Sequence, residues 1–264
     1  MAKAKTDVAD LVAAIRRHDP AGTNEQFGSL VAACQYRRLY DLVARWVRPG
    51  ARILDWGCGR GHLAYYLIRS GFEVNAYSLE HEPEIFASLS ASDRARLCFV
   101  RGTENDARRL PFAPGQFDAV FSVGVLEHVR ETGGEELASL VEIRRVLAAD
   151  GVFVCYHLPN RYSYIEAASR WLGRRRGDAG PEAFHRYRFT GTAIRRLCLE
   201  AGLRVSEAGR YGFLPRNSFN RLPRRLGDSR TLAWLVNTGD AALERLFSPV
   251  DQNYFFVARP GLLA

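Results

Sequence analysis

The sequence predicts an α/β protein built on a parallel sheet with helices on both faces. Two observations support this fold class. Short apolar runs of strand length alternate with segments of helix length along most of the 264 residues, as in sheets made of βα units. One of these runs also ends in a glycine-rich turn that leads directly into an apolar helix-length segment, at residues 53–68.

The length and composition indicate one large domain with insertions. Of the residues, 47% are hydrophobic and 25% are charged, as in ordinary globular proteins. Residues 1–35 show no clear periodicity and are expected to form an N-terminal extension or lid. Residues 36–264 are expected to form the main domain, with insertions at 159–185 and 215–249. No apolar run reaches the roughly 18 residues of a membrane span, and a soluble protein is expected.

The expected helices are marked by apolar stripes and by residues that begin or end helices. The first stripe begins at Tyr36 and ends before Pro49-Gly50, and a second helix is closed by Gly71. Thr190 is expected to cap a later helix through its hydroxyl. The expected helices span residues 36–47, 63–68, 137–147 (closed by Asp150-Gly151), 190–201 and 232–247.

The expected strands are short apolar runs between these helices. The first strand ends at Ile53 and Leu54. The later strands are expected at residues 72–77, 97–100, 119–123, 151–158, 203–206 and 253–258.

The most informative segment is the turn after the first strand. An acid, Asp55, is followed by three alternating glycines, Gly57, Gly59 and Gly61. Glycines allow positive φ values and let backbone N–H groups approach a ligand closely. The spacing differs from the G-x-G-x-x-G pattern of dinucleotide folds. A tight strand-to-helix turn without a ligand is the alternative interpretation.

This D-x-G-x-G-x-G pattern resembles the first motif of the class I S-adenosylmethionine-dependent methyltransferases. Other segments resembling motifs of that family follow in order, and the matches run from about Tyr36 to Arg259. These segments are Asp106-Ala107 with Leu110-Pro111-Phe112, Phe117-Asp118-Ala119-Val120-Phe121, Leu126-Glu127-His128-Val129, and Arg145-Val146-Leu147 with Asp150-Gly151. The resemblance implies a Rossmann-like, doubly wound sheet of seven strands, mostly parallel with an antiparallel last strand, plus lid insertions.

The resemblance implies S-adenosyl-L-methionine as the cofactor. Asp55 would face its methionine end, although an acid here also caps the next helix. Asp106 would accept a hydrogen bond from the adenine amino group, although an exposed loop acid is the alternative. The predicted cofactor-binding residues are Asp55, Gly57, Cys58, Gly59, Gly61, Ser78, Leu79, Glu80, Asp106, Ala107 and Val123.

One position departs from the family pattern. The second strand normally ends in an acid that binds both ribose hydroxyls, and here Ser78 stands in that place. A serine cannot make the bidentate, charge-assisted contact of a carboxylate. Glu80, two residues later, is the candidate replacement. If neither residue binds the ribose, a non-catalytic relative of the fold becomes the better hypothesis.

Two histidines are candidate catalytic bases. His128 follows the fourth strand and His157 lies near the end of the fifth, at the sheet edge where ligands bind in such folds. A capping or packing role is the alternative for His128. A base is needed only when the methyl acceptor is a weak nucleophile such as a hydroxyl. His185 is a third candidate.

No metal site is predicted. Some quinone-biosynthesis O-methyltransferases, which this segment also resembles, bind a divalent metal through E-x-x-E-H. Here Gly124 replaces the first glutamate, and only Glu127 and His128 remain. The five cysteines never have C-x-x-C spacing, which suggests neither a zinc site nor a disulfide framework and fits a reducing cytoplasm.

The net charge of +8 is concentrated in the two insertions. One run is Arg174–Arg176, and the other consists of Arg216, Arg221, Arg224, Arg225 and Arg230. These runs predict either an anionic partner, such as a phosphate-bearing substrate or a membrane surface, or simply a hydrated surface. Nucleic acid is the less favoured partner, because no RNA-binding module is recognisable. The sequence gives no signal for an oligomeric state.

The leading hypothesis is therefore a cytoplasmic methyltransferase that modifies a small-molecule or lipid-like acceptor, most readily at oxygen. The acceptor pocket is expected between the two insertions, with aromatic walls and nearby arginines. The rival hypothesis is a catalytically inactive relative of the fold that serves as a binding or regulatory subunit. Peripheral attachment to an anionic membrane through residues 215–249 is compatible with the leading hypothesis.

Overall fold

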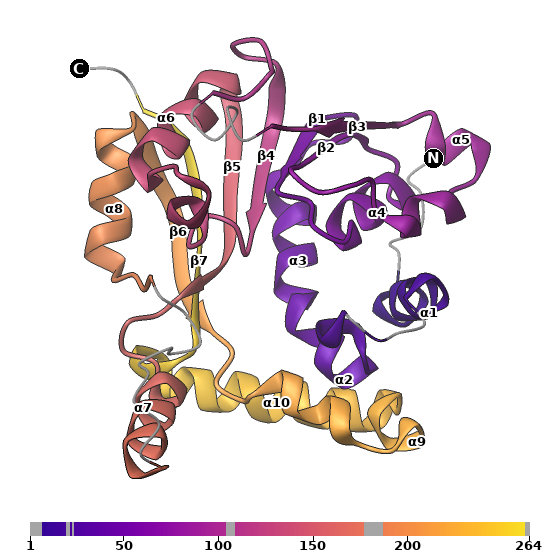
Figure 1. The fold of residues 1–264 in the computed structure, drawn as a ribbon, viewed down its shortest axis with the longest axis vertical. Helices are drawn as coiled ribbons and strands as arrows, with labels where there is room; N and C mark the ends of the chain where they lie inside the picture. Colours follow the sequence, from indigo (N-terminus) through magenta and orange to yellow (C-terminus); the bar gives the residue numbers. More distant parts are fainter. Residues whose placement is uncertain (1–6, 20–21, 23, 104–108, 177–186, 262–264) are drawn as a thin grey trace.

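The computed structural model describes residues 7–19, 22, 24–103, 109–176 and 187–261. Its centre is one seven-stranded sheet with the strand order β3-β2-β1-β4-β5-β7-β6 (Figure 1). The strands are β1 (Arg52–Trp56), β2 (Glu73–Ser78), β3 (Leu97–Arg101), β4 (Phe117–Val123), β5 (Leu147–Pro159), β6 (Leu203–Tyr211) and β7 (Asn253–Pro260). β7 runs antiparallel to both of its neighbours, and the pairs among β1 to β5 are parallel. The predicted fold class is confirmed.

Helices cover both faces of the sheet. Apolar side chains of α1, α3 and α4 pack on one face, and those of α6 and α8 pack on the other. The helices are α1 (Val8–His18), α2 (Leu30–Ala33), α3 (Arg37–Trp46), α4 (His62–Arg69), α5 (Ala91–Arg94), α6 (Glu136–Val146), α7 (Tyr164–Arg176), α8 (Gly191–Glu200), α9 (Arg224–Gly227) and α10 (Arg230–Phe247). Short 3-10 helices are η1 (Glu25–Phe27), η2 (Cys34–Tyr36), η3 (Glu84–Ser88), η5 (Val129–Thr132), η6 (Arg216–Arg221) and η7 (Ser248–Val250).

The expected elements are present, with two boundary corrections. α6 ends at Val146, and Leu147 already belongs to β5, so Asp150-Gly151 does not close the helix. Leu147 is buried and pairs with Phe117, and the register then shifts before the main ladder. β6 continues to Tyr211, five residues beyond the expected end, because its later part pairs with β7.

The N-terminal region is more regular than expected. α1 has an apolar face of Leu11, Val12 and Ile15, which is buried in the same core as α3 and α4. Asp7 caps the helix by accepting a hydrogen bond from the Ala9 backbone N–H at 3.2 Å. Apolar residues recur at helical spacing within residues 8–15, and this amphipathic pattern indicates the helix. The lid role of residues 1–35 stays a prediction.

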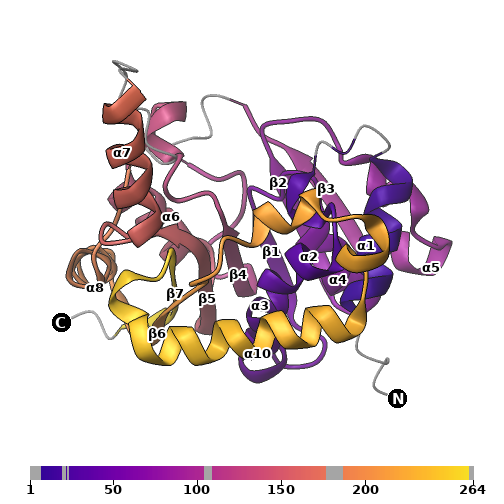
Figure 2. The same cartoon turned by 90° about the horizontal axis from the view of Figure 1, so that it is seen from below.

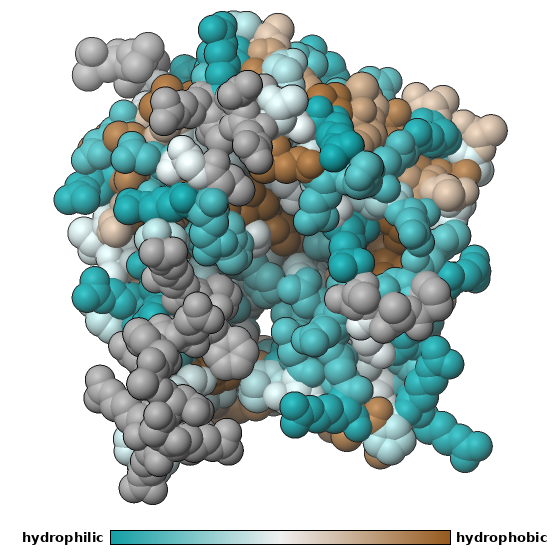
Figure 3. All heavy atoms as spheres, viewed as in Figure 1, coloured by the Kyte–Doolittle hydropathy of each residue, from teal (hydrophilic) through white to brown (hydrophobic). Residues whose placement is uncertain are grey.

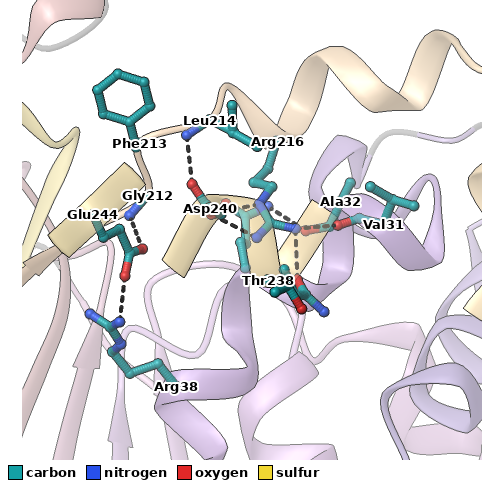
Figure 4. Close-up of polar contacts among 12 residues, drawn as sticks. Val31, Ala32, Arg38, Gly212, Phe213, Leu214, Arg216, Thr238, Asp240 and Glu244 are labelled. Carbon is teal, nitrogen blue, oxygen red and sulfur yellow. Dashed lines mark hydrogen bonds and ion pairs between the residues drawn. The ribbon is translucent and has the colours of Figure 1, made fainter. Parts of the chain in front are cut away.

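The second insertion contains a long helix, α10, that extends across one end of the molecule (Figure 2). Part of the predicted anion-binding run is buried here. Arg216 is 7% exposed and donates to the Asp240 carboxylate from Nε at 2.9 Å and from a terminal nitrogen at 2.6 Å (Figure 4). Arg216 is therefore a structural residue, and the prediction that it helps to form a hydrated or anion-binding arginine surface is wrong.

The first insertion contains α7, and residues 177–186, with His185, lie outside the described residues. Among the described helices, none is both long enough and apolar enough to cross a membrane.

Candidate cofactor and acceptor site

The glycine turn bends sharply between β1 and α4. Gly57, Gly59 and Gly61 all have positive φ, at 74°, 48° and 80°, which side chains with a Cβ rarely adopt. The backbone N–H groups of Gly57 and Cys58 donate to the Tyr77 carbonyl at 2.9 and 2.8 Å, so the turn is fastened to the end of β2. A Cβ added at Gly57 would lie 2.5 Å from Val125 Cγ2. Val125 thus packs so closely against Gly57 that a side chain at this position would force the turn or Val125 to move.

Asp55, in β1, stabilises this turn through a contact with the start of α4. Its side chain is buried, and Oδ2 accepts a hydrogen bond from the Ala64 backbone N–H at 3.0 Å. This contact ties the first turn of α4 to β1, as the capping alternative predicted. Burial raises the pKa of the Asp55 carboxyl to about 7. A direct contact between Asp55 and a cofactor stays a prediction.

The first of three cavities lies on the β2 side of the turn and has a volume of about 230 Å³. Gly57, Ser78 and Glu80 line it together with Leu79. Ser78 is buried, and its Oγ accepts the Glu80 backbone N–H at 3.1 Å, whereas Glu80 is exposed. Of these two residues, Glu80 therefore offers the carboxylate that a ligand in this cavity can reach on the β2 side.

The far wall of the first cavity contains the motif around Leu110. Arg145 donates to the carbonyl groups of Phe112 at 2.7 Å and Leu110 at 3.0 Å, and it pairs with Glu142 at 2.8 Å. Glu142 accepts the Leu110 backbone N–H at 3.0 Å. Two motifs far apart in the sequence thus form one wall of the cavity. Asp106 and Ala107 lie outside the described residues.

The second cavity lies on the other side of the turn, with a volume of about 410 Å³. Its lining includes the predicted residues Asp55, Gly57, Cys58, Gly59 and Val123. Sequence reasoning missed Tyr36 and His62, which also line it. His62 is the first residue of α4 and directly follows the glycine turn. This position next to the motif is the sequence signal that could have identified it as a site residue. Burial, with a smaller effect of His157, lowers the pKa of His62 to about 3.

The third cavity brings the two predicted histidines together. It has a volume of about 320 Å³, and its lining includes His128, His157, Glu127 and Tyr211. His157 and Gly124 line both the second and the third cavity, so these two cavities adjoin at His157. The space-filling view shows a hollow near the centre of the face drawn in Figure 3, with hydrophobic residues at the bottom of the hollow.

The two histidines are held differently. His157 has a φ of 70°, the one positive φ outside glycine among the described residues, and such strained positions cluster at functional sites. Its Nδ1 lies 2.5 Å from the Tyr211 hydroxyl oxygen. His128 is about half exposed, with Nδ1 3.0 Å from Glu131. His157 is therefore the more rigidly held of the two.

Glu127 is a buried carboxyl beside these histidines. It is 4% exposed, and Oε2 has no hydrogen-bond partner among the described residues. Burial is the main reason that its pKa rises to about 8. Within the described part of the chain, no group of three His, Cys, Asp or Glu residues is arranged to hold a metal ion.

We expect Glu127→Gln to stabilise the protein at high pH. The pKa of Glu127 is raised in the folded state. The contribution of this carboxyl to the free energy of unfolding is therefore fully present below its unfolded-state pKa, and it is lost as the pH rises through its folded-state pKa. Glutamine cannot ionise, so above about pH 8 the free energy of unfolding of this variant should be roughly 2 kcal/mol larger than that of the wild type. Urea unfolding at about pH 5 and about pH 9 measures the difference.

Glu135→Gln, which neutralises an exposed carboxyl of the same segment, is the matched control. A Glu127→Gln effect that does not grow with pH, or that the control reproduces, contradicts the burial of an ionisable carboxyl.

The fold and this site together define a class of protein. Ligands of open α/β sheets bind at the carboxyl ends of the strands, and here all three cavities lie around such ends, on both sides of a glycine turn. This arrangement is typical of nucleotide-binding α/β domains with an adjoining pocket for a second ligand.

Comparisons with known proteins agree with this class. Residues 54–155 match the family model described as a methyltransferase domain. The chain is 31% identical over 137 residues to the ubiquinone biosynthesis O-methyltransferase of Cereibacter sphaeroides, over 51% of this chain and 53% of that protein. The matches cover between 28% and 53% of the length of the first curated relatives.

Solved structures share the fold. The 1,6-didemethyltoxoflavin-N1-methyltransferase of Burkholderia thailandensis, bound to its substrate and S-adenosylhomocysteine, is 19% identical with a TM-score of 0.51, over 97% of this chain and 87% of that one. The [4+2]-cyclase SpnF is 20% identical with a TM-score of 0.55, over 86% and 82% of the two chains. Residues 54–155 therefore resemble a methyltransferase domain, and the chain shares its fold with solved methyltransferases.

Proposed function

We propose that the protein transfers a methyl group from S-adenosylmethionine to a small-molecule or lipid-like acceptor, at oxygen. One observation carries this proposal. Gly57 and Gly59 line both the first and the second cavity, so a single elongated ligand can lie across the turn with one end in each.

The residues present fit this cofactor. Its adenosine would occupy the first cavity, with the ribose beside Ser78, Leu79 and Glu80, and its methionine end would occupy the second, near Cys58 and Val123. The predicted contacts of Asp106 and Ala107 with the adenine concern residues outside the described part of the chain. When bound, S-adenosylmethionine supplies an electrophilic methyl group on a sulfonium ion.

Glu80→Gln is expected to weaken binding of S-adenosylhomocysteine about tenfold to a hundredfold. The reason is that a charge-assisted hydrogen bond contributes about 1.5–3 kcal/mol, and Glu80 is the carboxylate on the β2 side of the first cavity. Isothermal titration calorimetry measures the change. The control is Glu82→Gln, because Glu82 is a nearby exposed acid that pairs with Arg94 at 2.6 Å. Equal losses in both variants would rule out a specific ribose contact.

The acceptor would occupy the third cavity. At the wall shared with the second cavity, His157 would accept the proton of an acceptor hydroxyl that is held toward the cofactor site. The Tyr211 hydroxyl, in contact with Nδ1, fixes the orientation of the His157 ring. The likeness to a ubiquinone biosynthesis O-methyltransferase supports transfer to oxygen.

Transfer of a labelled methyl group into metabolites of the native extract tests the proposal. The wild type should label a discrete product at an oxygen atom, and His157→Gln should lower the initial rate by about 100-fold or more, because a positioned base contributes 10²–10⁴-fold. His128→Gln, from the more exposed site, should retain more of the rate. No labelled product from any extract fraction, despite cofactor binding, would refute the catalytic proposal.

A second hypothesis is a non-catalytic or differently acting relative of the fold. The serine at position 78 favours it, and the likeness to SpnF shows that this fold also occurs in a protein named as a cyclase. The two hypotheses differ in one respect. A regulatory or binding subunit keeps its function when Gly57 and Glu80 are substituted, whereas a methyltransferase does not.

A further inference from the structure

α10 is amphipathic with its polar side turned toward the protein. Asp240 is 4% exposed, binds Arg216, and accepts the Leu214 backbone N–H at 2.8 Å. One turn further, Glu244 pairs with Arg38 at 2.6 Å and accepts the Gly212 backbone N–H at 2.7 Å (Figure 4). These contacts fasten the helix to the chain after β6 and to α3, while Leu232, Ala233 and Val236 near its start pack against the apolar side chains of α2.

The side of α10 that faces away from the protein is largely apolar. Trp234 is 61% exposed, Leu235 is 53% exposed and Leu246 is 73% exposed. Leu235, Ala242 and Leu246 follow each other at spacings of seven and four residues, so they lie on one face. None of the exposed positions of α10 carries an acid. A helix that faces only water normally has the opposite pattern.

Exposed arginines that form no ion pair within the described residues lie on α10 and on η6 and α9, directly before it. Arg221, Arg224, Arg225 and Arg245 are exposed, and none forms an ion pair within the described residues. The acids of residues 215–249 are engaged elsewhere: Asp228 pairs with Arg16, Asp240 with Arg216, and Glu244 with Arg38. The surface of α9 and α10 is therefore apolar and positively charged at once.

We propose that this surface, formed by α9 and the outer side of α10, docks on an anionic phospholipid bilayer. Tryptophan and leucine side chains on such a helix enter the boundary between headgroups and acyl chains, and arginines bind lipid phosphates. Hydrophobic residues are visible along the lower edge of the molecule, where α10 lies (Figure 3), and the helix extends across that end in the view from below (Figure 2). The docking does not depend on the proposed enzymatic activity.

Sedimentation with lipid vesicles tests the docking. The full chain should bind vesicles that contain phosphatidylglycerol, should bind pure phosphatidylcholine vesicles weakly, and should be released by salt. The triple variant Arg221→Gln, Arg224→Gln, Arg225→Gln should bind on the order of 100-fold more weakly, since each basic residue near an anionic surface contributes about fivefold. Trp234→Ser with Leu235→Ser should lower binding by roughly tenfold or more.

The matched control removes three exposed arginines from α8 and β6, as Arg195→Gln, Arg196→Gln, Arg204→Gln. It lowers the net charge equally and should lose much less binding.

Three outcomes overturn the proposal. These are equal binding to neutral and anionic vesicles, equal losses in the two triple variants, or a dimer detected by light scattering that the Trp234→Ser, Leu235→Ser variant dissociates. In the last case, the apolar face pairs two copies of the chain. Circular dichroism verifies that each variant is folded, and the salt dependence of the wild type tests the proposal without any substitution.

Discussion

Gly57→Ala is expected to lower the affinity for S-adenosylhomocysteine by roughly a hundredfold or more. The backbone at Gly57 has a φ of 74°, where an L side chain costs about 1–3 kcal/mol. The added Cβ would also lie 2.5 and 2.9 Å from the two methyl groups of Val125, so the turn must move. Because Gly57 lines both the first and the second cavity, that movement changes both ends of the proposed cofactor site. Isothermal titration calorimetry measures the loss.

Gly50→Ala separates crowding from backbone strain. Gly50 has the same φ of 74°, but a Cβ there would meet nothing within 4 Å. This variant should lose stability and keep its affinity. If Gly57→Ala binds as the wild type does, or if Gly50→Ala loses as much affinity, the glycine turn is not the ligand cradle described above.

Arg216→Met is expected to destabilise the protein by about 3–5 kcal/mol, the usual effect of removing one partner of a buried ion pair. The substitution leaves the Asp240 carboxylate buried without its cation, and it also removes the hydrogen bond of Arg216 to Asn237 at 2.8 Å. Urea unfolding measures the change in the free energy of unfolding, and vesicle sedimentation with the same variant shows whether α10 keeps its position.

The double variant Arg216→Met, Asp240→Asn is the informative control. It removes the unpaired charge and keeps an oxygen that can accept the Leu214 backbone N–H, so it should regain a substantial part of the lost stability. Arg225→Met, at an exposed position, should change the free energy of unfolding by less than about 0.5 kcal/mol. A small effect of Arg216→Met would show that α10 is held mainly by apolar contacts.

The sheet was predictable from sequence because most of its strands are short apolar runs set between recognisable breaks. Gly71 ends α4 where expected, and the hydroxyl of Thr190 caps α8 by accepting the Ala193 backbone N–H at 3.2 Å. Both signals are local, as glycine and capping residues act on their own neighbours. The start of β5 at Leu147 was not predictable in the same way, because it depends on pairing with Phe117, thirty positions earlier.

The same distinction between local signals and long-range contacts applies to the candidate site. Gly57, Gly59 and the two histidines could be placed from motifs, since each lies near or just after the carboxyl end of a strand, at one sheet edge. The burial of Glu127 and the ion pair of Arg216 depend on elements far away in the sequence. Arg216 looked like one more exposed arginine because nothing near it in the chain indicates Asp240, which lies 24 residues later.

The central claim is that one cofactor lies across the glycine turn, and a crystal structure of the protein with S-adenosylhomocysteine tests it most directly. We expect adenosine in the first cavity with its ribose beside Glu80, and the homocysteine end in the second cavity beside Gly57 and Gly59. A ligand bound elsewhere on the protein, or no bound ligand because side chains of the protein fill both cavities, would contradict the account.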